Sequence, residues 1–219
     1  MRPELRELLG AEAQKFSVFI RENEIELFDR YLGLIQEYNK KLNLTGISDE
    51  NGIVVKHFID SLSAASFVKD RWFLMDVGSG MGCPGLAIKI VKPGLKIILL
   101  ESNQKKCAFI NQVIRSLKLE NARAIARRAE DKNFSAGIQG QIDAMLARAV
   151  GKLDLLSALS KPYLRKNGKL IAYKGPEAQK EFDEHKAAIE KNHFKFDKIL
   201  NYELPLQNGP RALVILKKI

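Results

Sequence analysis

The stretch Phe73-Leu-Met-Asp-Val-Gly-Ser-Gly-Met-Gly-Cys-Pro-Gly85 joins a short apolar run to four glycines within eight positions. The apolar run predicts a buried strand, and Pro84 is suited to the start of a helix that extends to Val91. Glycine tolerates a positive φ and lets a ligand approach the backbone closely. An ordinary strand-to-helix turn needs only one or two glycines. The loop therefore predicts a binding site for a small molecule.

The chain on the far side of this loop continues to alternate between strand-like and helix-like segments. A second strand is expected over Lys96–Glu101 and a second helix over Gln104–Leu117. Further strands are expected at Ala122–Ala126, Ile142–Leu146, Lys169–Lys174, Lys198–Leu204 and Ala212–Leu216. This alternation predicts an α/β fold, in which helices cover both faces of a parallel sheet. Ligands of such sheets bind beyond the carboxyl ends of the strands, which is where the glycine loop lies.

The residues that precede the first strand have a different pattern. Apolar residues recur at helical spacing from Pro3 to Asn43, and a short helix is expected over Ile53–Val68. Residues 1–70 carry 9 Lys or Arg against 12 Asp or Glu, whereas residues 71–219 carry 27 against 14. We therefore expect an N-terminal helical segment (1–70) and a cofactor-binding domain (71–219) with different roles.

Composition excludes several classes of protein. With 46% hydrophobic residues among 219, the chain is not expected to be disordered, and two cysteines do not form a disulfide scaffold. No uncharged apolar run reaches the length of a membrane span, and the first residues lack the apolar core of a signal peptide. We therefore expect a cytoplasmic protein with no membrane partner. The net charge of +10 points to a nucleic-acid partner.

The glycine loop allows two interpretations as a cofactor site. Residues 80–85 match Gly-x-Gly-x-x-Gly, the pattern of an NAD-dependent oxidoreductase on a Rossmann fold. Alternatively, Asp76-x-Gly-x-Gly80, followed by Glu101 at the end of the next strand, is the signature of S-adenosylmethionine binding. Asp76 favours the second, because a carboxylate is repelled by a pyrophosphate and attracted by an amino group or a sulfonium. A non-catalytic RNA-binding protein on a methyltransferase scaffold remains a third possibility.

Several short motifs together resemble one family. They are Asn43-Leu-Thr-Gly-Ile47, Lys56-His-Phe-Ile-Asp-Ser61, the 76–85 loop, Arg128-Ala-Glu130, Ala147-Arg-Ala149 and Tyr173-Lys-Gly175. In this order they resemble the bacterial 16S ribosomal RNA guanine-N7 methyltransferases, also called glucose-inhibited division protein B. The resemblance implies a class I S-adenosylmethionine-dependent methyltransferase, with a Rossmann-like, mostly parallel seven-stranded sheet. It also implies methylation of N7 of the guanosine usually numbered 527 in 16S rRNA.

The resemblance also implies which residues contact S-adenosyl-L-methionine. Carried over from the family, these contacts fall on Gly78, Cys83, Ala129, Glu130 and Arg148. Glu101 is the expected ribose ligand, and Asp76, Ser79 and Gly80 complete the cofactor loop. Cys83 replaces a leucine that many relatives have, and Ala129 replaces a valine. The expected partner is 16S rRNA, as free RNA, in an assembly intermediate or in the small ribosomal subunit, and the protein is expected to be a monomer.

Two basic residues are predicted to position the reactants. Arg148 lies at the C-terminal end of the strand predicted over Ile142–Leu146, where its guanidinium can hold the cofactor carboxylate or a substrate phosphate. Lys174 ends the next strand and is expected to reach the mouth of the site and to contact RNA. No general base is expected, because guanine N7 carries no proton.

A further group of polar residues has two possible roles. His57, Asp60 and Ser61 share one helix face, where they either support the site or dock the helix onto the sheet domain. We favour docking and leave both open. The histidines show no metal-ligand spacing, so no metal site is predicted.

Overall fold

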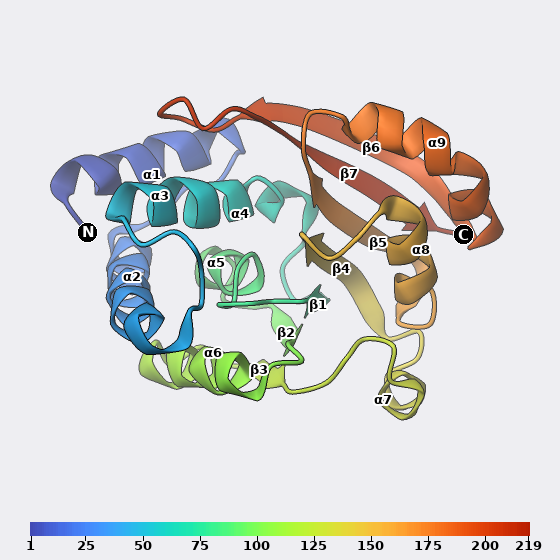
Figure 1. The fold of residues 1–219 in the computed structure, drawn as a ribbon, viewed down its shortest axis with the longest axis horizontal. Helices are drawn as coiled ribbons and strands as arrows, with labels where there is room; N and C mark the ends of the chain where they lie inside the picture. The colour runs from blue at the N-terminus through green and yellow to red at the C-terminus, as the bar shows by residue number, and fades with distance from the viewer.

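The fold centres on one seven-stranded sheet in a computed structural model that describes residues 1–219 (Figure 1). Its strand order is β3-β2-β1-β4-β5-β7-β6. The strands are β1 (Phe73–Val77), β2 (Lys96–Leu100), β3 (Ala122–Ile125), β4 (Ile142–Arg148), β5 (Leu164–Lys174), β6 (Phe194–Glu203) and β7 (Pro210–Lys218). The first five are parallel, whereas β7 is antiparallel to both β5 and β6. The predicted α/β class and the mostly parallel sheet are confirmed.

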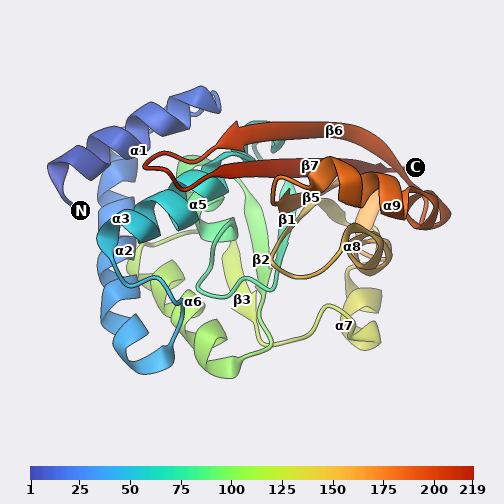
Figure 2. The same cartoon turned by 45° about the horizontal axis from the view of Figure 1, so that its top comes forward.

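The helices are divided between the two faces of the sheet (Figures 1 and 2). One face carries α1 (Pro3–Lys15), α2 (Glu22–Leu42), α3 (Glu50–Ile53), the π-helical turn η1 (Val54–Ile59), α4 (Asp60–Leu62), the 3-10 turn η2 (Ala65–Phe67), α5 (Gly85–Val91) and α6 (Gln104–Ser116). The other face carries α7 (Lys132–Gly137), α8 (Leu153–Ser160) and α9 (Ala178–Lys191). The helix expected over Ile53–Val68 is thus several short helical pieces, because the π-helical turn and the 3-10 turn interrupt it. No helix is both long and apolar enough to cross a bilayer.

Alternation along the strands supplies two hydrophobic cores. Leu74 belongs to the core beneath the N-terminal helices, and the next residue, Met75, belongs to the core beneath α8 and α9. The first core also contains Leu9 and Phe28, so the N-terminal helices bury their apolar faces against the sheet. The division at residue 70 is therefore a boundary in charge and secondary structure, and it does not separate two cores.

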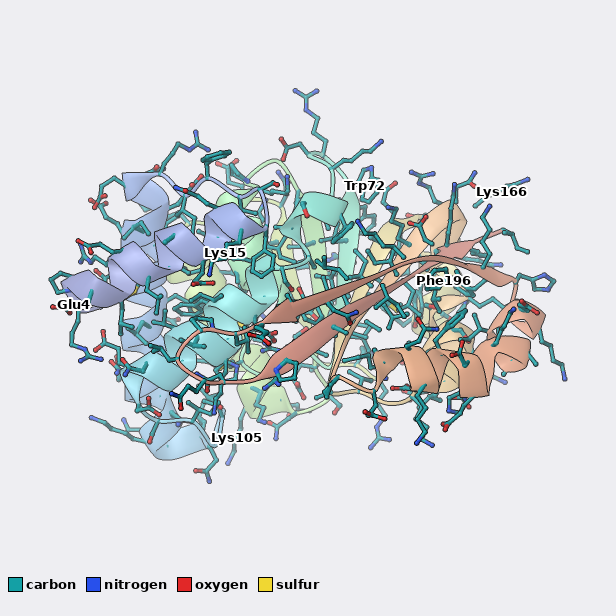
Figure 3. The ribbon with its side chains drawn as sticks, turned by 90° about the horizontal axis from the view of Figure 1, so that it is seen from above. Glu4, Lys15, Trp72, Lys105, Lys166 and Phe196 are labelled. Atoms are coloured by element: carbon teal, nitrogen blue, oxygen red, sulfur yellow. The ribbon has the colours of Figure 1, made fainter.

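The topology places a crevice next to the glycine loop. The chain runs from β1 outward to β2 and β3 on one side, and then returns to β4 on the other side of β1. Ligands of open α/β sheets bind at this switch point, beyond the carboxyl ends of the strands. Figure 3 shows the two ends of the parallel strands: Trp72, which precedes β1, lies on the opposite side of the molecule from Lys105, which follows β2.

Candidate cofactor and substrate site

The glycine loop between β1 and α5 has a backbone that only glycine adopts easily. Gly78, Gly80 and Gly82 have φ values of 66°, 59° and 102°. A Cβ atom on Gly78 would lie 2.9 Å from Val150 Cγ2, and one on Gly82 would lie 2.8 Å from the hydroxyl of Tyr31. Both the conformation and the close contacts therefore require glycine.

The side chain of Asp76 is fully buried beneath this loop. Its Oδ2 accepts a hydrogen bond from the backbone N–H of Gly85 at 2.9 Å, whereas its Oδ1 is buried without a partner. Burial raises the pKa of this carboxyl to about 7. A buried acceptor without a partner is costly, and a cationic group of a ligand beside the loop would relieve that cost.

Glu101 and Ser79 hold the loop from the side of β2. Glu101 Oε2 accepts from the backbone N–H of Gly80 at 2.8 Å, and its Oε1 accepts from that of Asn103 at 2.8 Å. Ser79 Oγ is 3.4 Å from the backbone oxygen of Leu100 on β2, and it also donates to the backbone oxygen of Asp76 on β1 at 2.9 Å. An ionised carboxylate can accept about four hydrogen bonds, so Glu101 keeps capacity for a ligand. Its role as a ribose ligand stays a prediction.

Two hollows meet at Gly78. The first, of about 180 Å³, is lined by Val77, Gly78, Leu100, Ser102, Arg127, Arg128, Ala129, Glu130, Val150 and Leu159. The second, of about 370 Å³, is lined by Leu44, Thr45, Ile47, Lys56, His57, Asp60, Gly78, Ser79, Gly80, Met81, Cys83, Arg148, Ala149 and Arg211. The structure thus brings most of the predicted site residues around these hollows, while Asp76 and Glu101 support the loop that separates them.

Arg148 lines the second hollow, and most of its hydrogen-bond donors bind other groups of the protein. Its Nη1 donates to Asp60 Oδ2 at 3.0 Å and to the backbone oxygen of Lys56 at 3.1 Å. Its Nη2 donates to His57 Nδ1 at 3.2 Å and to the backbone oxygen of Cys83 at 3.3 Å. A guanidinium has five N–H donors. Only the Nε–H therefore remains for a cofactor carboxylate or a phosphate, so Arg148 can offer such a ligand one hydrogen bond.

His57 is a neutral part of this network. Arginine can only donate, so His57 Nδ1 accepts, and its Nε2 carries the proton and donates to Thr45 Oγ1 at 3.0 Å. Burial, together with the charge of Arg148, lowers the pKa of the ring to about 3. The ring is uncharged at neutral pH, and both of its nitrogens are engaged.

Asp60 and Ser61 complete the attachment of the N-terminal segment. Asp60 Oδ1 accepts from the hydroxyl of Tyr202 on β6 at 2.6 Å, and the backbone oxygen of Ser61 accepts from the hydroxyl of Tyr173 on β5 at 2.6 Å. The two residues and His57 therefore dock the helical pieces onto the sheet, and His57 and Asp60 also line the second hollow.

Comparison with known proteins decides which family this site belongs to. A family model described as rRNA small subunit methyltransferase G matches residues 24–207. The chain belongs to this methyltransferase family. The ribosomal RNA small subunit methyltransferase G of Clostridium tetani is 38% identical over 215 residues, which cover 97% of this chain and 90% of that protein. The protein of the same name from Lactococcus lactis is 35% identical and covers 93% and 87%.

Solved structures confirm the class I methyltransferase fold. The crystal structure of M. jannaschii TYW2 in complex with AdoMet superposes with a TM-score of 0.60 at 15% identity and covers 78% of this chain and 77% of that one. Fibrillarin from Aeropyrum pernix, with bound S-adenosyl-L-methionine, gives a TM-score of 0.54 at 14% identity and covers 68% and 67%. Family and fold together make this chain an S-adenosylmethionine-dependent methyltransferase, as the sequence motifs predicted.

The residues of the methyltransferase fit this cofactor. The unpartnered Oδ1 of Asp76 suits a donor with positive charge, and the open backbone at Gly78 joins the two hollows. Ala129 and Glu130 line the first hollow, where apolar residues beside polar ones suit an adenosyl group with its apolar ring and its ribose hydroxyls. The individual contacts predicted for these residues stay predictions.

Lys174 is placed differently from the sequence-based expectation. Its Nζ donates to the backbone oxygen of Gly151 and to Glu181 Oε1, both at 2.7 Å, and its side chain is only 11% exposed. Lys174 lines neither hollow. Its ammonium group points into the methyltransferase domain because Glu181 lies within reach on α9, so it does not lie at the mouth of the site.

Sequence reasoning assigned no role to several residues of the site. Thr45 lies within the motif Asn43–Ile47, and only its position as a polar residue in that loop could have indicated a role in the site. Lys56 and Arg211 line the second hollow of the methyltransferase as well. Arg211 is a single arginine near the start of the last strand, and no motif surrounds it.

Proposed function

We propose that the enzyme transfers a methyl group from S-adenosylmethionine to N7 of one guanosine in 16S rRNA, the guanosine usually numbered 527. One observation carries this proposal: Gly78 of the cofactor loop lies between a hollow that has Val77, Leu100 and Val150 among its lining residues and a second hollow that is lined by Lys56 and Arg211. The first suits an adenosyl group, and the second suits a base attached to a phosphate backbone. Membership of a family named for rRNA methylation supports the choice of substrate.

The reaction needs orientation of the base more than it needs proton transfer. When bound, S-adenosylmethionine supplies a methyl group on a sulfonium, so a N7–carbon bond forms while the carbon–sulfur bond breaks. Guanine N7 offers a lone pair without a proton, and alignment alone can supply much of the rate.

The side chains of the second hollow agree with a reaction that uses no general base. His57 has both nitrogens engaged and a pKa lowered to about 3 by burial and by Arg148. Asp60 accepts from Arg148 and from Tyr202. These groups therefore hold the walls of the hollow and leave the backbone loop to face the base.

Charge around the second hollow supports an RNA substrate. Lys56 is exposed and Arg211 is half-buried, and both line this hollow. Contacts to phosphate make affinity fall with salt, with a slope of about −0.7 per contact on a single strand. We propose that these two cations contact substrate phosphates, and that the protein acts as a monomer on free 16S rRNA, on an assembly intermediate or on the small subunit.

Methyl transfer to RNA tests the proposed function. Radiolabelled S-adenosylmethionine is incubated with naked 16S rRNA and with small subunits, each from cells that lack the modification. After nuclease digestion, the label should co-migrate with N7-methylguanosine, and RNA from modified cells should take up none. Lys56→Ala and Arg211→Ala should raise KM for RNA. Lys166→Ala should leave this KM unchanged, because Lys166 is near the start of β5, on the opposite side of the molecule from Lys105 (Figure 3). Label in another nucleoside, or none in either substrate, would refute the proposal.

A further inference from the structure

An ion pair behind the first hollow connects two helices and a strand to one loop. Lys174, the last residue of β5, bonds to Glu181 of α9 and to the backbone oxygen of Gly151. The same Glu181 Oε1 accepts from the backbone N–H of Leu153, the first residue of α8, at 2.9 Å. The pair thus holds residues 149–153, which join β4 to α8, at Gly151 and at Leu153.

This loop forms part of the wall of the cofactor hollow. Val150 lines the first hollow, and it lies so close to Gly78 that a Cβ there would be 2.9 Å from Val150 Cγ2. Ala149, the residue before it, has a φ of 58°, which is unfavourable for a residue with a side chain. Such a conformation persists only where neighbouring contacts impose it. The bonds to Gly151 and Leu153 are contacts of this kind.

We propose that Glu181 and Lys174 are positioning residues for the cofactor: they hold the 149–153 loop so that Val150 shapes the hollow beside Gly78. The inference rests on the cofactor role of the first hollow, which the proposed function shares. It replaces the expected contact between Lys174 and RNA. The side chain of Lys174 is nearly enclosed, and its ammonium already donates to two oxygens.

Substitutions of Lys174 and Glu181 should weaken cofactor binding to different extents. Lys174→Met keeps the length of the side chain and removes both of its hydrogen bonds, so Gly151 loses its partner. Glu181→Gln keeps an oxygen that can accept from Leu153 and from Lys174, and it removes only the charge. We expect the Kd for S-adenosylhomocysteine to rise about tenfold in the first variant and about threefold in the second.

The experiment combines calorimetry of S-adenosylhomocysteine binding with RNA binding at several salt concentrations. Both variants should bind a 16S rRNA fragment with the affinity and salt dependence of the wild type, and hydrogen exchange at Val150 and Gly151 should be faster. A matched pair on the same strand serves as the control. Lys169 lies in the middle of β5, and its Nζ is 3.3 Å from Asp197 Oδ2. Lys169→Met and Asp197→Asn should leave the Kd for S-adenosylhomocysteine unchanged.

Three results would overturn the inference. The first is a Kd for S-adenosylhomocysteine within twofold of the wild-type value in Lys174→Met, or in Glu181→Gln if the former does not fold. The second is a loss of RNA affinity with a shallower salt dependence in Lys174→Met, which would show a phosphate contact. The third is an equal loss of cofactor affinity in the Lys169→Met control. Since calorimetry needs no RNA substrate, failure of the proposed methylation would leave this test intact.

Discussion

The contact between Arg148 and Asp60 predicts a large and specific effect on stability. Arg148→Met would remove four hydrogen bonds and leave Asp60, whose side chain is 7% exposed, with Tyr202 as its only side-chain partner. Removing one member of a buried ion pair costs about 3–5 kcal/mol. Domains of this size lose about 2–4 °C in Tm per kcal/mol. We therefore expect a folded variant with a Tm lower by about 6–20 °C and no methyl transfer.

A double-mutant cycle measures whether the unpaired charge of Asp60 causes this loss of stability. Urea unfolding followed by circular dichroism gives the free energy of unfolding of Arg148→Met, Asp60→Asn and the double variant. Because the double variant leaves no unpaired charge, it should be more stable than the sum of the single losses predicts, by at least about 1.5 kcal/mol.

An exposed ion pair provides the control for that cycle. Arg165 bonds to Asp143, and the side chain of Arg165 is 43% exposed. Arg165→Met should cost less than about 1 kcal/mol. The reasoning would be refuted if Arg148→Met cost no more than Arg165→Met, or if the losses of Arg148→Met and Asp60→Asn were additive.

Three further substitutions test the buried titratable groups and the glycine loop. The pKa of His57 is about 3 in the folded protein against 6.5 as a free side chain. Protonation of His57 in the unfolded chain should therefore lower the free energy of unfolding by about 2 kcal/mol as pH falls from 7 to 5. The pKa of Asp76 is about 7 in the folded protein against 3.8 as a free side chain. Ionisation of Asp76 should therefore lower the free energy of unfolding by about 2 kcal/mol as pH rises from 5 to 7. Relative to the wild type in urea unfolding, His57→Gln should lose stability and Asp76→Asn should gain it as pH rises from 5 to 7; a change of the opposite sign in either variant would contradict the assignment for that residue. Gly78→Ala, which meets Val150 and has a φ of 66°, should weaken S-adenosylhomocysteine binding more than tenfold in calorimetry, whereas Gly10→Ala, with open space in α1, should not change it.

The sheet could be predicted because its signals are local. The apolar run Phe73–Val77, the glycines after it and the helix-length segments that follow determine strand, turn and helix within a few residues of one another. The π-helical turn over Val54–Ile59 was not predicted, because it has no distinctive spacing of apolar residues. How the N-terminal helices pack depends on contacts with distant strands, so the sequence indicated only that their apolar faces needed a partner.

The site could be predicted where topology alone brings residues together. Carboxyl ends of neighbouring parallel strands meet at one edge of the sheet, and this places Gly78, Glu101 and Arg148 side by side. Lys174 also ends a parallel strand, yet its direction depends on Glu181, which follows it by seven residues on α9. Arg211 reaches the second hollow from an antiparallel strand. The rule for parallel strands places the backbone of Lys174 but not its side chain, and it does not apply to Arg211.

The arrangement around Arg148 changes what a loss of activity in that residue would mean. Four of its five donors bind Asp60, His57 and backbone oxygens, so the guanidinium joins the N-terminal segment to β4 and to the cofactor loop at Cys83. An inactive Arg148 variant would therefore be expected even if Arg148 touched neither substrate. Only the single Nε–H remains for direct contact, and one hydrogen bond to a charged group contributes about 1.5–3 kcal/mol. A loss of cofactor affinity well beyond the matching 10- to 150-fold would have to come from displacement of the loop itself, because the contact alone cannot supply it.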